Sequence, residues 1–164
     1  MERAVRLPVQ VRPAKPGESQ SLTALCVRSK AHWGYDAGFM ELSAAALVVN
    51  EHDITAGRVL VAVDDSGCLI GMACVLLDGQ TADLDALFVD PPAIGGGAGR
   101  LLFDAAVALA RQLGARRMTI LADPNAAAFY ERVGARYLRH APSDAIPGRM
   151  LPFYEFDLTS RTAA

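Results

Sequence analysis

A glycine-rich turn between an apolar segment and an amphipathic one limits the folds that are open to this chain. Four of the five residues from Gly95 to Gly99 are glycines, and only Ala98 carries a side chain. The segment before the turn, residues 84–89, is apolar apart from Asp85. After the turn, leucine and alanine recur at helical spacing over residues 102–113. The pattern predicts a strand, a tight turn and a helix whose first backbone amides are uncovered.

Uncovered amides at the start of a helix favour the binding of a phosphate group. The first N–H groups of a helix have no partner within it, and the helix dipole adds positive potential there. A turn without side chains also lets a ligand approach the backbone closely. We therefore expect residues 95–100 to bind the phosphates of an anionic cofactor. The alternative is that the glycines form a flexible surface loop.

Two familiar phosphate-binding motifs do not match this turn. A P-loop has Lys followed by Ser or Thr after its last glycine, whereas Gly99 is followed by Arg100 and Leu101. The dinucleotide fingerprint Gly-x-Gly-x-x-Gly, counted from Gly95, would place Arg100 in its last position. That fingerprint also follows the first strand of a long alternating domain, and only 65 residues remain after Gly99. A nucleotide-binding protein is therefore disfavoured.

The strand and turn resemble motif A of the GNAT superfamily of N-acetyltransferases, a valine-rich strand and Pro followed by Arg/Gln-x-x-Gly-x-Gly/Ala. Gly97, Ala98 and Gly99 match the last three positions, whereas Ile94 stands where the family usually has Arg or Gln. The resemblance implies acetyl-CoA as the cofactor, bound by the strand and the turn. The residues expected to contact it here are Leu87, Phe88, Val89, Gly95, Gly96, Gly97, Ala98, Gly99 and Arg100.

A second resemblance lies in a short helix predicted after the next strand. The run Asp-Pro-Asn-Ala-Ala-Ala-Phe-Tyr-Glu-Arg-Val-Gly, residues 123–134, looks like GNAT motif B, with Ala135 in place of the usual Phe. The resemblance implies that Asn125 and Phe129 line the cofactor and that Tyr130 protonates the leaving thiolate. Tyrosine suits this role because its pKa of about 10 keeps it protonated at neutral pH. The alternative is that Tyr130 only packs against the sheet.

Aminolysis of a thioester also needs a base for the amine and a hydrogen-bond donor for the acyl oxygen. In a GNAT-like site the donor is a backbone amide of the central strand, here Leu87 or Val89. Strand alternation predicts that Asp83 and Asp85 share a face with these two residues. Asp85 is the first candidate for the base and Asp83 the second. The alternative is that both are solvated strand charges.

An unusual aromatic run precedes a helix predicted at about residues 37–49. It surrounds Gly34 and Gly38 and holds the only tryptophan. In GNAT proteins, residues of this region usually line the acceptor pocket, so the resemblance implies that these side chains bind the acceptor. The alternative is that they belong to the hydrophobic core. The expected acceptor-binding residues are His32, Trp33, Tyr35, Phe39 and Met40, with Glu41 as a further polar candidate. The sequence does not distinguish between an amino acid, a polyamine, an aminoglycoside-like drug and a protein N-terminus as the acceptor.

Composition and charge exclude several classes of partner. The chain has 164 residues, of which 52% are hydrophobic and 21% charged, as in one compact domain. Its net charge of −2 argues against a nucleic-acid partner. No apolar run approaches the roughly 20 residues of a membrane span, and no signal-peptide pattern opens the chain. We therefore expect no membrane partner and a cytoplasmic protein. The three cysteines and three histidines show no metal-ligand spacing, so no metal is expected.

The order of predicted elements indicates the fold class. A short strand at residues 6–12 and two helices precede hairpin strands, and the helix after the glycine turn precedes three more strands and one short helix. This order predicts one GNAT-like α+β domain over residues 1–164, an α/β sandwich with a mixed, mostly antiparallel sheet of six to seven strands and about four helices. The predicted enzyme transfers acetyl from acetyl-CoA to a primary amine of a small molecule or peptide in a ternary complex, with a homodimer as a possible assembly. The alternative, kept open by Ile94, is a non-catalytic acyl-CoA-binding or sensing module.

Overall fold

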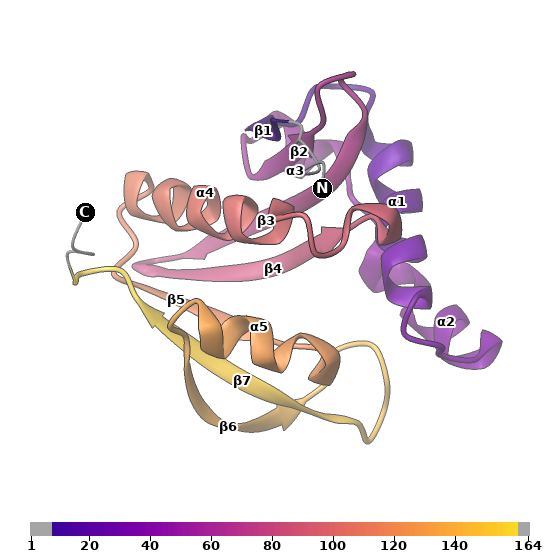
Figure 1. The fold of residues 1–164 in the computed structure, drawn as a ribbon. Helices are drawn as coiled ribbons and strands as arrows, with labels where there is room; N and C mark the ends of the chain where they lie inside the picture. Colours follow the sequence, from indigo (N-terminus) through magenta and orange to yellow (C-terminus); the bar gives the residue numbers. More distant parts are fainter. Residues whose placement is uncertain (1–7, 161–164) are drawn as a thin grey trace, which may run out of the picture.

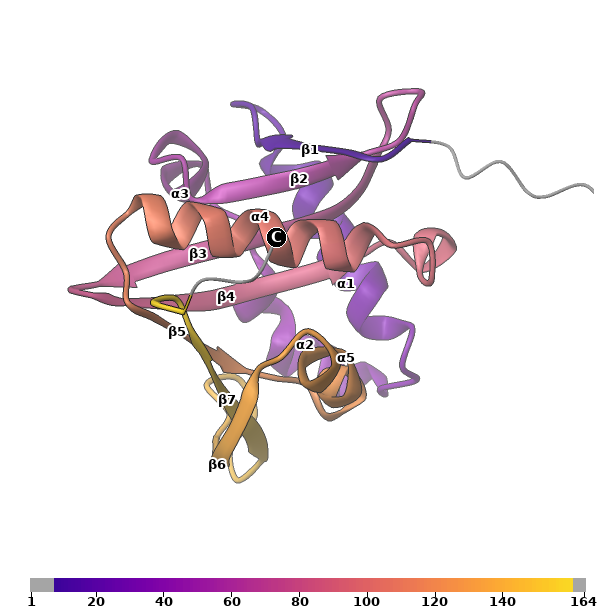
Figure 2. The ribbon, with the colours of Figure 1, turned by 60° about the vertical axis from the view of Figure 1, so that its left-hand side comes forward.

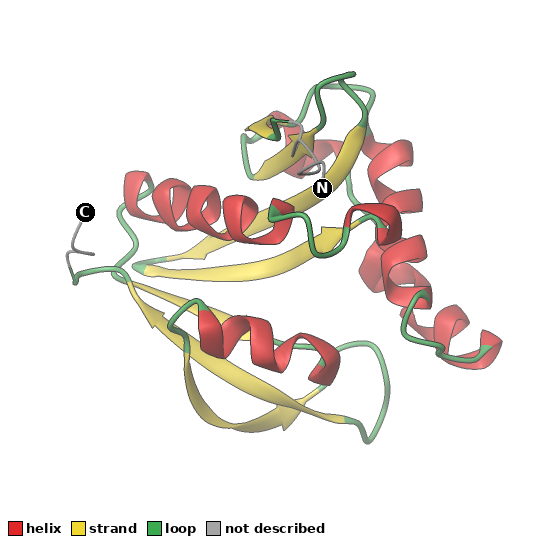
Figure 3. Cartoon of the chain, viewed as in Figure 1, coloured by secondary structure: helices red, strands yellow, loops and turns green. Residues whose placement is uncertain are grey.

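The computed structural model describes residues 8–160 and contains a seven-stranded sheet flanked by helices (Figures 1 and 3). The strands are β1 (Gln10–Pro13), β2 (Val59–Val63), β3 (Leu69–Asp78), β4 (Thr81–Val89), β5 (Arg117–Leu121), β6 (Arg136–Pro142) and β7 (Met150–Asp157). The α-helices are α1 (Ser19–Ala31), α2 (Ala37–Ser43), α3 (Glu51–Thr55), α4 (Ala98–Gln112) and α5 (Ala127–Arg132). Three short 3-10 helices are η1 (Ala44–Leu47), η2 (Pro91–Ala93) and η3 (Pro124–Ala126).

The strands lie in the order β1-β2-β3-β4-β5-β7-β6, and all neighbours are antiparallel except β4 and β5. This arrangement confirms the predicted mixed, mostly antiparallel α+β fold. The helix predicted at about residues 37–49 is instead the shorter α2 followed by the 3-10 helix η1, and the short helix α3 was not predicted. The first predicted strand is present as β1, and residues 6–7 of that prediction lie outside the described residues. No helix of residues 8–160 has the length and apolar character that a membrane span requires.

Helices cover both faces of the sheet. Figure 2 shows α4 in front of β3 and β4, with α1 behind them. On the first face, Leu102 and Phe103 of α4 belong to a core that includes buried residues of β3, β4 and β5. On the second face, Leu22 and Leu25 of α1 pack with residues of β2 and β3. The central strand β4 therefore has buried residues on the α4 side and the partly buried Ala86 and Phe88 on the α1 side.

Helix α4 begins directly after the glycine turn. Its N-cap residue Gly97 has φ of +93°, a left-handed conformation that glycine adopts without the steric cost that a Cβ imposes. No side chain caps this end of the helix. At the other end Gly114 has φ of +84° and follows the last turn. The predicted strand, turn and helix are therefore confirmed, with the first amides of α4 left without a side-chain partner.

Strand β4 contains a bulge at Asp85. Ala86 pairs with Cys74 of β3, whereas Leu84 pairs with the next β3 residue, Val75. Asp85 is therefore an extra residue on β4 that has no paired residue on β3.

The bulge reverses which face the side chains of β4 take. Leu84, before it, belongs to the core under α4, and Leu87 and Val89, after it, pack against the same core. Regular alternation would have placed Leu87 and Val89 with Asp83 and Asp85, on the opposite face from Leu84. The prediction that these four residues share a face is wrong, because the additional residue shifts the alternation by one.

The parallel strands β4 and β5 separate after three residue pairs. Their pairing ends with Asp83 opposite Thr119. Beyond this pair β4 continues to Val89 and β5 to Leu121, and Figure 1 shows the two strands diverging toward α1. The centre of the sheet is therefore split at the carboxyl ends of these strands, between the start of α4 and α5.

Candidate active site

Two cavities meet beside the split between β4 and β5. The larger cavity, of about 820 Å³, lies between the glycine turn, the end of β4 and α5. The smaller cavity, of about 210 Å³, lies between η1, β4 and the loop that joins β6 to β7. Six residues line both cavities and define the junction between them: Lys30, Leu87, Phe88, Asp123, Ala126 and Tyr130.

The larger cavity contains most of the predicted cofactor-binding residues. Those that line it are Leu87, Phe88, Val89, Gly95, Gly97, Gly99, Arg100, Asn125 and Phe129. Gly96 does not line it, and the side chain of Ala98 is buried in the core under α4. Ile94 lines the cavity with 44% of its surface exposed, so an apolar side chain occupies the position of the usual Arg or Gln. The backbone, rather than that side chain, is what the turn offers to an anion.

The edge of β4 that faces the split presents backbone groups to the larger cavity. The Asp90 N–H donates to the Ile70 carbonyl oxygen at 2.8 Å. Because bonded and non-bonded pairs alternate along an antiparallel ladder, Leu87 and Val89 direct their N–H and C=O groups away from β3. The ladder with β5 has already ended at Asp83. These groups are therefore available to a ligand.

Tyr130 lies at the junction. The side chain comes from α5, is 6% exposed and packs edge-on against Phe103 and Phe129. Burial raises the pKa of its hydroxyl above the ordinary range, and no charged or hydrogen-bonded group among the described residues offsets this shift. The hydroxyl therefore stays protonated at neutral pH and can hold a proton where the two cavities meet.

The two predicted base candidates line only the smaller cavity. Asp83 accepts a hydrogen bond of 3.3 Å from the Thr119 hydroxyl of β5. Burial, and then the charge of Asp85, raise the pKa of Asp83 to about 6. Burial, and then the charges of Asp53 and Asp144, raise the pKa of Asp85. Both carboxylates can therefore accept a proton closer to neutral pH than an ordinary aspartate.

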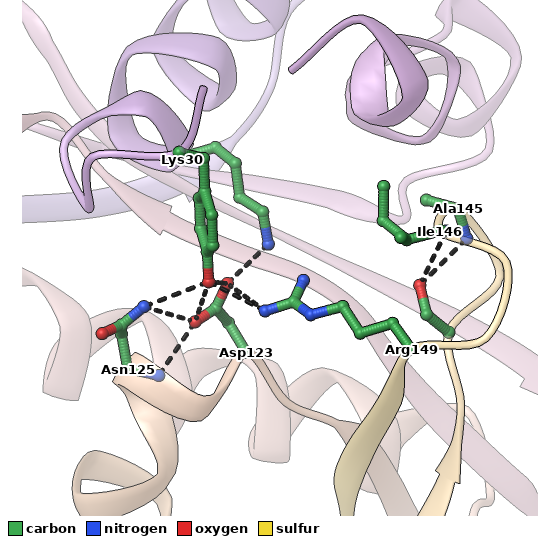
Figure 4. Close-up of polar contacts among 8 residues, drawn as sticks. Lys30, Asp123, Asn125, Ala145, Ile146 and Arg149 are labelled. Atoms are coloured by element: carbon green, nitrogen blue, oxygen red, sulfur yellow. Dashed lines mark hydrogen bonds and ion pairs between the residues drawn. The ribbon is translucent and has the colours of Figure 1, made fainter. Parts of the chain in front are cut away.

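Asp123 is the centre of a polar network that the sequence did not reveal (Figure 4). Its Oδ2 accepts from Lys30 Nζ at 2.6 Å and from the Tyr35 hydroxyl at 2.9 Å. Its Oδ1 accepts from the Asn125 backbone N–H at 2.8 Å and from Asn125 Nδ2 at 2.9 Å. Arg149 Nη2 donates to the Tyr35 hydroxyl at 2.8 Å and lies 3.8 Å from Asp123 Oδ2. The network joins α1 and the loop after it to η3 and to the β6–β7 loop.

The charge of Asp123 is retained in this network. Burial acts to raise its pKa, but the hydrogen bonds from Lys30, the Asn125 backbone and Tyr35 outweigh burial and lower the pKa overall. The sequence analysis assigned no role in the site to Asp123, Lys30 or Arg149. No local spacing connects these three residues, so no sequence pattern could have identified the network.

The structure separates the aromatic side chains predicted to bind the acceptor. Tyr35 and Phe39 stack with ring centroids 4.0 Å apart, and the Arg149 guanidinium carbon lies 4.8 Å from the Phe39 centroid. Trp33 lines the larger cavity rather than the smaller one. The aromatic pair therefore supports Arg149, whereas Trp33 is placed to contact a cofactor.

The remaining acceptor candidates lie away from both cavities. Met40 packs against the core on the α1 side. His32 is exposed, with its ring 5.2 Å from that of Trp33. Glu41 is exposed on α2. None of the residues predicted to bind the acceptor lines the smaller cavity, whereas Ser43, Ala46 and Leu47, which follow them in the chain, do.

Other reactive groups do not form a second centre. Burial raises the pKa of the Cys26 and Cys74 thiols to about 12 in each case, so both are weak nucleophiles at neutral pH. Across residues 8–160, no three side chains of the metal-binding types gather closely enough to hold a metal ion. Among the described residues, the polar groups at the two cavities include backbone amides, carboxylates and the Tyr130 hydroxyl.

Several solved structures share this arrangement of elements. The PaiA N-acetyltransferase of Thermoplasma acidophilum in complex with CoA has a TM-score of 0.76 and 16% identity, covering 92% of this chain and 99% of that one. A GCN5-related N-acetyltransferase of Rhodopseudomonas palustris has a TM-score of 0.73 and 25% identity, covering 95% and 99%. The putative acetyltransferase YncA of Salmonella typhimurium, solved with acetyl-CoA, has a TM-score of 0.68 and 22% identity, covering 96% and 98%.

The sequence itself matches a family model. A comparison with curated proteins gives no match. The model described as the acetyltransferase (GNAT) family, however, matches residues 28–135, which extend from the end of α1 to the end of the α5 region. This segment includes the glycine turn, the bulged strand β4 and Tyr130. The chain therefore belongs to the acetyltransferase (GNAT) family and is a GNAT N-acetyltransferase family enzyme.

Proposed function

We propose that this enzyme transfers the acetyl group of acetyl-CoA to a primary amine of a small molecule, by direct attack in a ternary complex. The observation that carries the proposal is the position of Tyr130, which lines both the larger and the smaller cavity. Each cavity can take one substrate, and the junction brings the two together. The family match and the CoA-bound and acetyl-CoA-bound relatives support acetyl-CoA as the donor.

The larger cavity fits an acyl-CoA in three respects. Its volume of about 820 Å³ is within the usual range for small-molecule sites. The start of α4 has no side-chain cap and is preceded by the glycine turn, which suits a pyrophosphate. The open edge of β4 can bond the amides of an extended chain, as an added strand would. A bound acetyl-CoA would supply a thioester with an electrophilic acyl carbon.

The residues at the junction can perform the proton and charge transfers that aminolysis requires. The N–H of Leu87 or Val89 can donate a hydrogen bond to the acyl oxygen, where negative charge develops. Asp85, with Asp83 as the second candidate, can take the proton of the amine directly or through water. Tyr130 can give its proton to the sulfur atom that leaves. These roles remain predictions, as do a homodimer and a cytoplasmic location.

A broad panel of amines tests the proposal. We expect CoA release and a mass increase of the acetylated amine for at least one member. CoA release should be measured against a blank without amine, because the exposed Cys68 thiol also reacts with thiol reagents.

Ligand binding is tested separately by thermal shift with acetyl-CoA, ATP and NAD. A ligand at 100 times its dissociation constant adds about 2.7 kcal/mol to the stability. Stabilisation by ATP alone would contradict an acyl-CoA site. Stabilisation by acetyl-CoA without turnover of any amine would favour the non-catalytic binding module instead.

A further inference from the structure

The smaller cavity is lined by cationic side chains and by a group of carboxylates. On the side of the polar network it is lined by the cations Lys30 and Arg149 and by the carboxylate of Asp123, so the cations are in excess there. Three carboxylates, Asp83, Asp85 and Asp144, line the remainder. The charges that shift the pKa of Asp83 and Asp85 are those of other carboxylates, and no cation contributes. A ligand complementary to both groups of charges carries charges of both signs.

Arg149 has donors that the protein does not use. Of its three guanidinium nitrogens, only Nη2 donates a hydrogen bond to another residue within 8–160, and Figure 4 shows a second nitrogen that no dashed line reaches. The side chain is 19% exposed and lines the smaller cavity but not the larger one. A guanidinium group has five N–H donors in a planar fork, which matches a carboxylate.

The network holds Arg149 in place without neutralising it fully. Asp123 is closer to Lys30, at 2.6 Å, than to Arg149, at 3.8 Å, and it accepts further bonds from Tyr35 and Asn125. The guanidinium also lies 4.8 Å from the centroid of the Phe39 ring, which fixes its plane. Arg149 is thus a positioned cation with spare donors at a ligand cavity, as anion recognition requires.

We propose that the acceptor is a small amino acid-like zwitterion, whose carboxylate is bound by Arg149 and whose amine lies on the side of Asp85. The proposal rests on the function proposed above and adds the chemical class of the acceptor. A carboxylate on Arg149 lies beside the network, and an amine a few bonds away lies between Asp85 and the junction. A diamine would meet the carboxylates at one end but would place a cation against Arg149 at the other.

Matched acceptors test this class. The panel consists of the common α-amino acids, β-alanine and 4-aminobutyrate, each compared with its methyl ester, together with simple diamines. We expect at least one free acid to be acetylated with a kcat/KM roughly 10- to 100-fold above that of its ester, the range of a hydrogen bond to a charged group. Equal values for acid and ester, or a preference for diamines, would overturn the proposal.

Variants of Arg149 assign the preference to this side chain. In Arg149→Gln the ratio of kcat/KM between acid and ester should fall close to one, through a higher KM for the acid, while Arg149→Lys should keep part of it. If Arg149 had only a structural role, its replacement would lower kcat/KM for the acid and for the ester by the same factor. Arg139→Gln is the matched control, because Arg139 lies 4.7 Å from the Phe153 ring and lines neither cavity. Its ratio should equal that of the parent enzyme.

The outcomes separate this proposal from the one on which it rests. Acetylation of amines without any preference for a carboxylate would leave the acetyltransferase function intact and refute the zwitterion. A preference that persists in Arg149→Gln would refute the role of Arg149. Binding of acetyl-CoA with no acetylation of any amine would refute both.

Discussion

Lys30 and Asp123 form an ion pair of 2.6 Å at the junction of the two cavities, although 93 residues separate them in the chain. Lys30 comes from the end of α1, and Asp123 directly precedes η3. The pair therefore links α1 to the segment of η3 and α5 that carries Tyr130.

Asp123→Asn should destabilise the protein. The change leaves Lys30 and Arg149 without a carboxylate partner in a mostly buried setting, for which we expect a loss of about 1–3 kcal/mol in the free energy of unfolding. Urea denaturation measures it. Asp104→Asn is the control, because it removes an exposed ion pair with Arg100 and should change stability by less than about 0.5 kcal/mol.

The effect of Asp123→Asn should depend on pH. The folded protein lowers the pKa of Asp123, so its contribution is present above the ordinary value and is lost as pH falls through the lowered one. The stabilities of the parent and Asp123→Asn proteins should therefore converge in acid. A constant difference down to pH 2 would show that the carboxylate charge is not what stabilises the network.

Tyr130→Phe should reduce turnover with little effect on stability. The hydroxyl has no hydrogen-bond partner among the described residues, so its removal leaves no unpaired group behind, and we expect a change of about 1 kcal/mol or less. Loss of a general acid should lower kcat by roughly 10²- to 10⁴-fold, with the KM for acetyl-CoA nearly unchanged. Near-normal turnover would show that water or another residue protonates the thiolate.

Gly97→Ala should weaken the binding of acetyl-CoA. At a φ of +93° an added Cβ is strained and projects into space that the protein leaves open at the start of α4. Gly114→Ala is the matched control. Gly114 has a φ of +84° and no atom near the position of an added Cβ, and it lies beyond the other end of the same helix. Both variants should lose about 1 kcal/mol of stability. Only Gly97→Ala should lose affinity for CoA, as measured by calorimetry.

Asp83→Asn should stabilise the protein at neutral pH. The folded protein raises the pKa of Asp83 to about 6, so its contribution is fully present below the ordinary value and is lost as pH rises through about 6. The parent should therefore lose stability between about pH 4 and 6, by about 1 kcal/mol after allowance for partial solvation. The free energy of unfolding of Asp83→Asn, measured by urea denaturation at several pH values, should not show this decrease. Parallel curves for the two proteins would contradict the raised pKa.

Features of this protein that depend on neighbours within one element could be predicted from the sequence alone. The glycine turn, the helix after it and the short helix with Tyr130 each follow from spacings of a few residues, because helix periodicity and turn conformation are local. Together with their resemblance to two GNAT motifs, these spacings were enough to predict the fold and to name several residues that line the larger cavity.

The arrangement of the smaller cavity depends instead on contacts between elements that are far apart in the chain. The bulge at Asp85 follows from the pairing of β4 with β3, and it reverses the face that alternation predicts. Arg149 reaches Tyr35 across 114 residues, and Lys30 reaches Asp123 across 93. Contacts over such distances leave no periodic signal in a single sequence, because they depend on how separate elements pack rather than on any repeat along the chain.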